Sequence, residues 1–208
     1  MTDARVRPTG SLPAEVTSFV GRQDEIIEIT RLLYRARLVT LTGRAGIGKS
    51  RLALRVAAQL RRAFPHGASL VDLAGVREGL LIGHTVERTL GLPGGVPPDR
   101  ELLLILDNCE HLVDDCAKYV DHLLCHAGKL RVVATSREAL RVAGERTWAV
   151  GPLGEPAAAK LFAERASAVQ PAFRLTQRNR RAVLDLCRRL RGVPLAIEQA
   201  ALHRPAPK

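Results

Sequence analysis

A glycine-rich segment carries the clearest chemistry in this sequence. It reads GRAGIGKS and matches the spacing GxxxxGK[ST] at every fixed position. Glycines at these points let backbone N–H groups converge on an anion, while Lys49 adds a positive charge. The hydroxyl of Ser50 is a hard oxygen ligand of the kind that Mg²⁺ prefers. The segment therefore predicts a binding site for nucleotide phosphates, formed by Gly43, Ala45, Gly46, Ile47, Gly48, Lys49, Ser50 and Arg51.

A second candidate is the acid that ends the apolar run LLLILD, Asp107. A magnesium ion at a phosphate-binding loop needs an anionic partner, so we expect Asp107 to hold the metal together with Ser50. Asp107 could instead only cap the next helix. The following position holds Asn108, whose amide cannot accept a proton from an attacking water. Glu110 either takes that role from a shifted position or complements a helix dipole, and the sequence leaves both interpretations open.

The elements that must position these residues alternate between strands and helices. Short apolar or β-branched runs predict strands, and amphipathic segments between them predict helices. The expected strands are 38–42, 68–73, 102–106, 130–135 and 147–150, and the expected helices are 22–34, 50–64, 80–90 and 113–126. This alternation is typical of a doubly wound parallel sheet. The predicted fold class is therefore α/β, with about five strands in the sheet.

A change of composition after Gly151 divides the chain. Strand-like runs cease there, and the segments 155–169, 177–190 and 195–202 have helical periodicity. We therefore expect three parts: a flexible N-terminal arm over 1–17, a phosphate-binding α/β domain over 18–151 and a small helical subdomain over 152–204.

Composition narrows the classes of protein to which the chain can belong. Of 208 residues, 46% are hydrophobic and 25% are charged, which favours a packed core over disorder. Only 3% are aromatic, so stacking platforms for single-stranded nucleic acid are scarce. The net charge of +11 favours a phosphate-bearing partner, which could be a nucleotide or DNA. The apolar runs are far shorter than the roughly 18 residues of a membrane span, and the N-terminus lacks the apolar core of a signal peptide. We therefore expect a cytoplasmic protein with no membrane partner. The four cysteines form no CxxC pair, so we expect reduced thiols.

Five motifs in order give the chain a resemblance to a known family. They are FVGR, TGRAGIGKSRLA, LLLILDNCEHL, VVATSREAL and GVPLAIE, and the resemblance that they carry spans residues 19–202. The chain resembles the NB-ARC-like domain of STAND-class P-loop NTPases in bacterial transcriptional regulators of the AfsR/SARP and LuxR types. The resemblance implies ATP or ADP with Mg²⁺ as the cofactor. It also implies a larger regulator with winged-helix, repeat and DNA-binding domains as partners, and it leaves nucleotide-dependent self-association open.

The resemblance further implies roles for residues outside the glycine-rich segment. Val20 and Gly21 match the segment that holds adenine through backbone contacts. Arg137 matches the sensor arginine that reaches the γ-phosphate, a task that suits a guanidinium because it donates to several oxygens at once. Pro194 matches a residue that packs over the base or ribose. The alternatives are that Val20 and Gly21 form an ordinary helix lead-in, that Arg137 is a solvated surface arginine, and that Pro194 is a proline in the first turn of a helix.

The chain departs from the family at two places. The connection over 90–101 is rich in Gly and Pro where relatives usually carry an additional helix. The winged-helix, repeat and DNA-binding domains are not in this sequence. We therefore expect either an excised domain or a short member of the family.

Three functions follow from these patterns. The first is a switch domain that binds ATP or ADP and hydrolyses ATP slowly, because Lys49, Asp107 and Arg137 are present while Asn108 replaces a catalytic acid. The alternative is a DNA-binding module, because 177–202 superficially resembles a helix-turn-helix in a basic chain. Its second helix, LAIEQAAL, is too apolar to read bases, so DNA binding is not expected of this fragment. The third is an efficient stand-alone ATPase or kinase.

Overall fold

The computed structural model describes residues 12–203. Residues 1–11 of the expected arm and residue 204 of the expected helical subdomain lie outside this range. The elements, with η for a 3-10 helix, are α1 (Gln23–Arg35), β1 (Leu38–Thr42), α2 (Lys49–Leu60), η1 (Arg61–Ala63), β2 (Ala68–Asp72), α3 (Leu81–Leu90), β3 (Leu103–Asp107), η2 (Cys109–His111), α4 (Val113–His126), β4 (Arg131–Ser136), β5 (Arg146–Ala149), α5 (Glu155–Val169), α6 (Gln177–Arg189) and α7 (Pro194–His203).

The chain divides into two compact units. Within the described residues, the sheet unit holds 12–16, Asp24–Gly43 and Lys49–Ala149. The helical unit holds Thr17–Gln23, Arg44–Gly48 and the segment from Val150 onward. The expected domain boundary between 151 and 152 stays a prediction.

A five-stranded parallel sheet forms the centre of the sheet unit. Its strand order is β2-β3-β4-β1-β5, and every neighbouring pair is parallel. The predicted α/β fold class is therefore confirmed. Because parallel strands share one carboxyl edge, the loop after β1 and the acid at the end of β3 emerge at the same edge of the sheet.

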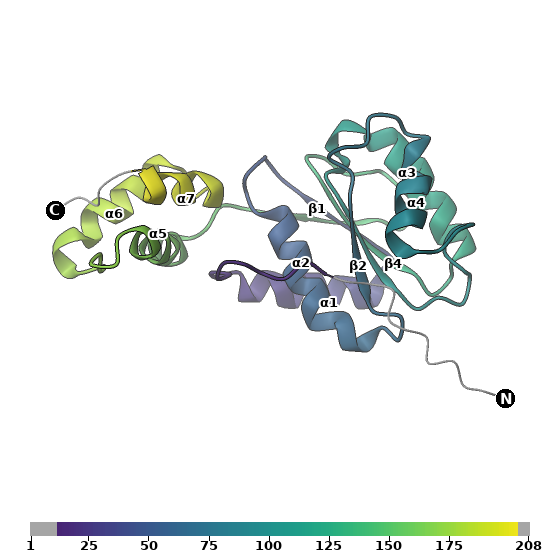
Figure 1. Cartoon of the computed structure of the whole chain (residues 1–208), viewed down its shortest axis with the longest axis horizontal. Coiled ribbons are helices and arrows are strands. Elements are labelled where there is room, and N and C mark those ends of the chain that lie inside the picture. Colours follow the sequence, from purple (N-terminus) through teal and green to yellow (C-terminus); the bar gives the residue numbers. More distant parts are fainter. Residues whose placement is uncertain (1–11, 204–208) are drawn as a thin grey trace. The chain divides into compact units, whose positions relative to one another are not determined.

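Helices cover both faces of this sheet, with α3 and α4 on one face and α1 and α2 on the other (Figure 1). All five residues of β3 are buried, as expected for an unbroken apolar strand between two helical layers. Helix α4 buries Cys116, Val120, Leu123 and Leu124, which share one face of the helix. Each such aliphatic side chain contributes about 1.5–3 kcal/mol when fully buried.

The helical unit has an apolar core of its own. Phe162 of α5, Val183 of α6 and Ile197 of α7 are fully buried there, and Val20 from the segment before α1 belongs to the same core. Phe162 also meets Phe173 edge to face, with ring centroids 5.9 Å apart. Helix α6 begins with a capping box between Thr176 and Asn179.

The end of α2 differs from the expected helix 50–64. The α-helix ends at Leu60, the 3-10 turn η1 follows, and Phe64 is extended with φ −111°. The cause is Pro65, whose ring disfavours helical geometry in the preceding residue. Within residues 12–203, no helix is long and apolar enough to cross a membrane.

Candidate functional site

The glycine-rich loop joins β1 to α2. Gly43, Gly46 and Gly48 have φ values of 148°, 73° and 98°, a range that other residues rarely adopt. Space also restricts position 46, because a Cβ there would lie 3.0 Å from Cβ of Leu195. The loop conformation therefore requires glycine at the motif positions.

Lys49 lies buried at the start of α2. Lys49 is only 7% exposed, and its Nζ donates a hydrogen bond to the carbonyl oxygen of Gly43 at 2.8 Å. A buried ammonium group is costly unless polar or anionic groups surround it. The arrangement can thus present a partly desolvated positive charge to an anion at the loop.

The two residues predicted to hold Mg²⁺ meet in the sheet unit. Ser50 Oγ donates to Asp107 Oδ1 at 2.7 Å, and Thr135 Oγ1 donates to the same oxygen. The Thr135 hydroxyl in turn accepts from the backbone N–H of Asn108 at 3.0 Å. Neither η2 nor α4 has a side-chain cap. Asp107 is therefore tied to the loop serine and to β4, and it does not act as the helix cap that the sequence also allowed.

A second carboxylate lies beside Asp107 and was not predicted. Asp72 ends β2 and pairs in register with Asp107 of β3. Its Oδ1 accepts from Asn108 Nδ2 at 2.8 Å and from the N–H of Ala74 at 2.9 Å. The run ASLVD ends in an acid, just as LLLILD does, and this feature of the sequence could have revealed Asp72.

Glu110 and Arg137 come together at the same edge. Arg137 directly follows β4, and its Nε lies 3.9 Å from Glu110 Oε1. The side chain of Arg137 is 66% exposed, so this long ion pair contributes little to stability. Glu110 Oε2 is buried without a hydrogen-bond partner among the described residues. Glu110 lies in η2, ahead of the first turn of α4.

The middle of the loop is held within the helical unit. Arg22 Nη2 donates to the carbonyl oxygens of Ile47 at 2.8 Å and of Gly151 at 2.9 Å. The N–H of Leu195 donates to the carbonyl oxygen of Gly46 at 3.2 Å. Arg22 is the last residue of the FVGR motif, and the sequence did not predict it as a site residue. Its positive φ of 66° sets its backbone apart, and no local sequence pattern predicts it.

The remaining predicted residues lie around this part of the loop. Pro194 Cγ is 3.8 Å from the position that a Cβ on Gly48 would take. Val20 is 7% exposed within the apolar core of the helical unit, and a Cβ on Gly21 would lie 3.0 Å from Cβ of Ala157. Ala45 is exposed and Arg51 is half-buried. The binding roles of these residues stay predictions.

Two buried thiols lie just behind Asp107. Cys109 Sγ donates to the carbonyl oxygen of Leu106 at 3.4 Å. A hydrogen bond with Cys116, together with burial, raises the pKa of Cys109 well above its ordinary value. The same hydrogen bond lowers the pKa of Cys116. Cys109 therefore stays protonated and acts as a packing residue beside the site.

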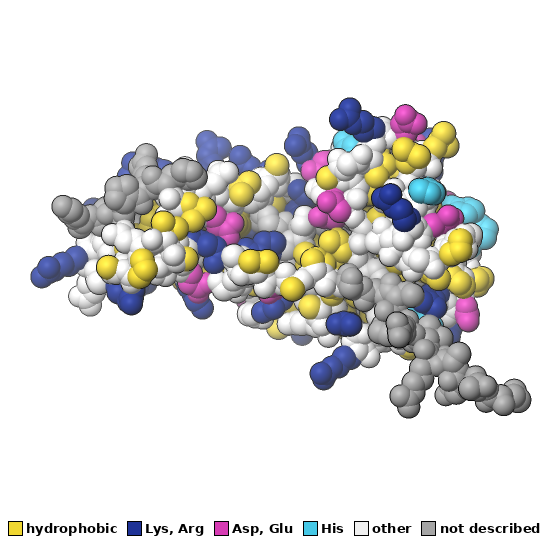
Figure 2. Space-filling view, viewed as in Figure 1, with side chains coloured by type: hydrophobic (Ala, Val, Ile, Leu, Met, Phe, Trp, Pro, Cys, Tyr) yellow, Lys and Arg dark blue, Asp and Glu magenta, His cyan; other side chains and the backbone are white. Residues whose placement is uncertain are grey.

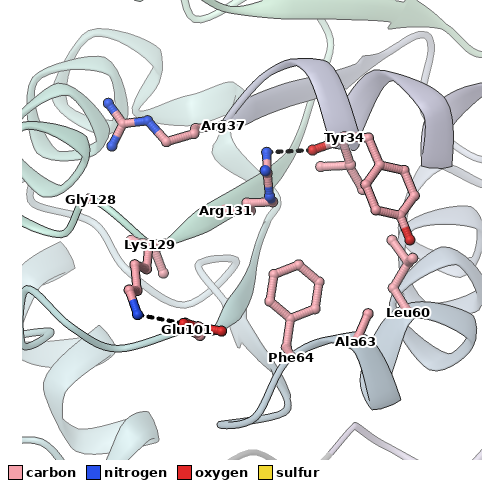
Figure 3. A pocket seen from close by; sticks show the side chains of 11 residues that line it. Tyr34, Arg37, Leu60, Ala63, Phe64, Glu101, Gly128, Lys129 and Arg131 are labelled. Atoms are coloured by element: carbon pink, nitrogen blue, oxygen red, sulfur yellow. Dashed lines mark hydrogen bonds and ion pairs between the residues drawn. The ribbon is translucent and has the colours of Figure 1, made fainter.

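A separate cavity of about 380 Å³ lies at the opposite edge of the sheet (Figure 3). Its lining includes Arg131 at the start of β4 and Arg37 just before β1, so it lies at the amino ends of the strands. Lys129 pairs with Glu101 at 2.6 Å, and Arg131 Nη1 donates to the carbonyl oxygen of Leu33. This cavity is distinct from the glycine-rich loop.

Solved structures with the same fold include ATPases. A STAND protein with a tetratricopeptide repeat sensor from Pyrococcus horikoshii has a TM-score of 0.60 and 18% identity, covering 99% of this chain and 33% of that one. RuvB of Thermotoga maritima has a TM-score of 0.60 and 13% identity, covering 88% of this chain and 61% of that one. At these identities the likeness concerns the fold.

Curated relatives are closer in sequence. An uncharacterized protein of Mycobacterium tuberculosis is 44% identical over 198 residues, covering 89% of this chain and 50% of its own length. A second protein of that organism, whose name classes it as an HTH-type transcriptional regulator, is 45% identical over 82% of this chain and 20% of its own length. The regulatory protein AfsR of Streptomyces coelicolor is 30% identical over 79% of this chain and 22% of its own length. In sequence, the chain is therefore similar to one segment of AfsR-type regulators, and in fold it is similar to a STAND ATPase.

The chain covers only part of each of these relatives. It spans half the length of the first relative and about a fifth of the two regulators. No family model matches the chain. In this chain the P-loop motif is Gly43–Ser50, and the acid at the end of the buried strand β3 is Asp107.

Proposed function

We propose that this chain is a STAND-type ATPase domain that binds ATP or ADP with Mg²⁺ at the P-loop and acts as a nucleotide switch within a larger regulator. The observation that carries the proposal is the hydrogen bond of 2.7 Å between Ser50 Oγ and Asp107 Oδ1. It joins, across 57 positions of the sequence, the two oxygen-bearing side chains that the motifs assign to the metal.

The residues present fit such a cofactor. A hydroxyl and a carboxylate are the hard oxygen ligands that Mg²⁺ takes in proteins, and they are already adjacent. The positive φ values of Gly46 and Gly48 allow the loop to curl around an anion, with Lys49 at its base. Bound Mg²⁺ supplies charge neutralisation for the β- and γ-phosphates. The family resemblance adds adenine as the base and the segment at Val20 and Gly21 as its backbone partner.

Slow hydrolysis follows from the side chains around Asp107. The Asn108 amide donates to Asp72, and an amide cannot accept a proton from water. Glu110 is the carboxylate that we assign to orienting the attacking water, because it lies beside Arg137, with its Oε1 3.9 Å from Arg137 Nε. Arg137 is exposed and weakly paired, so its guanidinium can turn toward a γ-phosphate. A slowly decaying ATP state that differs from the ADP state in its contacts is what a switch requires.

The first prediction tests nucleotide binding. Replacing Lys49 with Ala removes the charge at the base of the P-loop, so MgATP and MgADP should bind at least about tenfold more weakly in titration calorimetry, a loss of about 1.4 kcal/mol. Lys118→Ala, on the exposed face of α4, is the matched control and should bind as the unchanged chain does. Equal nucleotide affinities of the Lys49 variant and the unchanged chain would contradict the proposal.

The same preparation distinguishes a switch from an efficient enzyme. We expect turnover of saturating MgATP far below about 1 s⁻¹, the lower end of typical enzymes. Rapid multiple turnover without a partner would instead favour the stand-alone ATPase or kinase. A cytoplasmic location and partner domains within a larger regulator belong to this proposal, on the strength of the composition and of the relatives.

A further inference from the structure

The helical unit concentrates the positive charge of the chain. The segment 174–191 contains one acid, Asp185, against seven arginines: Arg174, Arg178, Arg180, Arg181, Arg188, Arg189 and Arg191. Its net charge is thus +6, out of +11 for all 208 residues. All seven arginines are exposed. Figure 2 shows Lys and Arg side chains in dark blue over the helices of this unit.

Helix α6 arranges four of these arginines in a row. Val183 and Cys187 form its buried face. At 3.6 residues per turn, the positions opposite that face are 178, 181, 182, 185, 188 and 189. Four of them are arginines, and we call Arg178, Arg181, Arg188 and Arg189 the arginine row. At a rise of 1.5 Å per residue, the row extends about 16 Å along the helix.

Most of the row is available to a partner. Arg188 is paired with Glu155, at 2.8 Å from Nε to Oε1, and with Asp185. Among residues 12–203, the side chains of Arg178, Arg181 and Arg189 have no hydrogen bond or ion pair. Three exposed guanidinium groups are therefore without an acidic partner among the described residues.

The character of this surface favours a phosphate backbone over an acidic protein. The exposed large apolar residues of the described chain all lie outside 174–191, so the row lacks the apolar or aromatic anchor that dominates protein interfaces. Phe173 is 6% exposed, and no aromatic residue lies in 174–191 to stack on an unpaired base. Arginine binds phosphate oxygens in a bidentate manner, and the segment contains no lysine.

We propose that the arginine row of α6 binds the phosphate backbone of duplex DNA without reading its sequence. The sequence-based expectation against DNA binding rested on α7 as a base-reading helix. In the structure, α7 buries Ile197 and Ala201, and its Glu198 pairs with Arg165 at 3.0 Å. The row lies on a different helix, and backbone contacts need no base-reading side chains.

The second prediction uses the complete chain and a fluorescent duplex of mixed sequence, measured by anisotropy between about 50 and 200 mM salt. We expect binding that weakens steeply with salt. The triple variant Arg178→Gln, Arg181→Gln, Arg189→Gln should reduce the slope of log affinity against log salt by about 2.7, since each lost phosphate contact removes about 0.9. Glutamine keeps the helix propensity, and circular dichroism verifies that the variant is folded.

A matched variant distinguishes the contribution of the arginine row to DNA binding from that of the overall charge. Arg61→Gln, Arg62→Gln, Arg77→Gln removes the same charge from exposed positions of the sheet unit and should leave the slope unchanged. Equal losses in both triple variants, or equal binding of polyglutamate and duplex, would refute the proposal. Lys49→Ala should bind the duplex with the same affinity as the unchanged chain does. This result tests DNA binding separately from nucleotide binding.

Discussion

At the P-loop, a single oxygen of Asp107 accepts hydrogen bonds from two hydroxyl groups, those of Ser50 and Thr135. Asparagine at this position can keep both hydrogen bonds through its amide oxygen but lacks the negative charge that a divalent cation needs. The third prediction is therefore that Asp107→Asn remains folded and binds ADP equally well with Mg²⁺ or with a chelator. Titration calorimetry in both conditions measures this, with Asp72→Asn as the control that keeps its response to Mg²⁺. A preserved Mg²⁺ response in the Asp107 variant would contradict the metal assignment.

The site could be predicted where one motif or one strand end defines it. Ser50 has a fixed place in GxxxxGK[ST], and Asp107 ends an unbroken apolar strand, so both were predicted and they meet in the structure. Asp72 and Thr135 were missed because their place beside Asp107 depends on which strands pair and in which register. Arg22 was missed because its acceptors, Ile47 and Gly151, lie far away in the sequence.

At the level of elements, periodicity and strand composition were sufficient for most of the fold. The strand 38–42 and the helices 113–126 and 155–169 match the structure at both ends. The ends that differ depend on single residues, such as Pro65 beyond α2 and the left-handed Asn108 before η2, with φ 63°. The grouping of residues 44–48 with the helical unit could not be predicted, because it arises from long-range contacts.

The turn between α6 and α7 yields the fourth prediction. Gly192 has φ +63°, and a Cβ there would lie 2.6 Å from the carbonyl oxygen of Leu153, which is backbone and cannot move freely. Gly192→Ala should lower the free energy of unfolding by at least about 1–2 kcal/mol. Gly151→Ala is the matched control, because a Cβ there meets no atom within 4 Å. Urea denaturation of both variants measures the difference, and similar midpoints would argue against the turn geometry.

At the scale of the whole molecule, burial of a thiol makes stability depend on pH. Cys187 is 2% exposed, and burial raises its pKa from 9.0 to about 11. The unfolded chain therefore releases this proton first, so the contribution is fully present below about pH 9 and is lost as pH rises toward 11. The fifth prediction is that the free energy of unfolding falls less between about pH 8 and 10 in Cys187→Ala than in the unchanged chain. Urea titrations at the two pH values test this, and identical decreases would show that Cys187 does not contribute.

The helical unit is assembled from three separate stretches of sequence, and this has a consequence for biosynthesis. The carbonyl oxygen of Gly46 receives its hydrogen bond from Leu195, and that of Ser18 from Arg165. On the ribosome, both acceptors emerge long before their donors are translated. A nascent polypeptide halted ahead of α7 would contain the entire P-loop motif and still leave Gly46 without its donor, so the helical unit can complete its hydrogen bonds only after α7 has been translated.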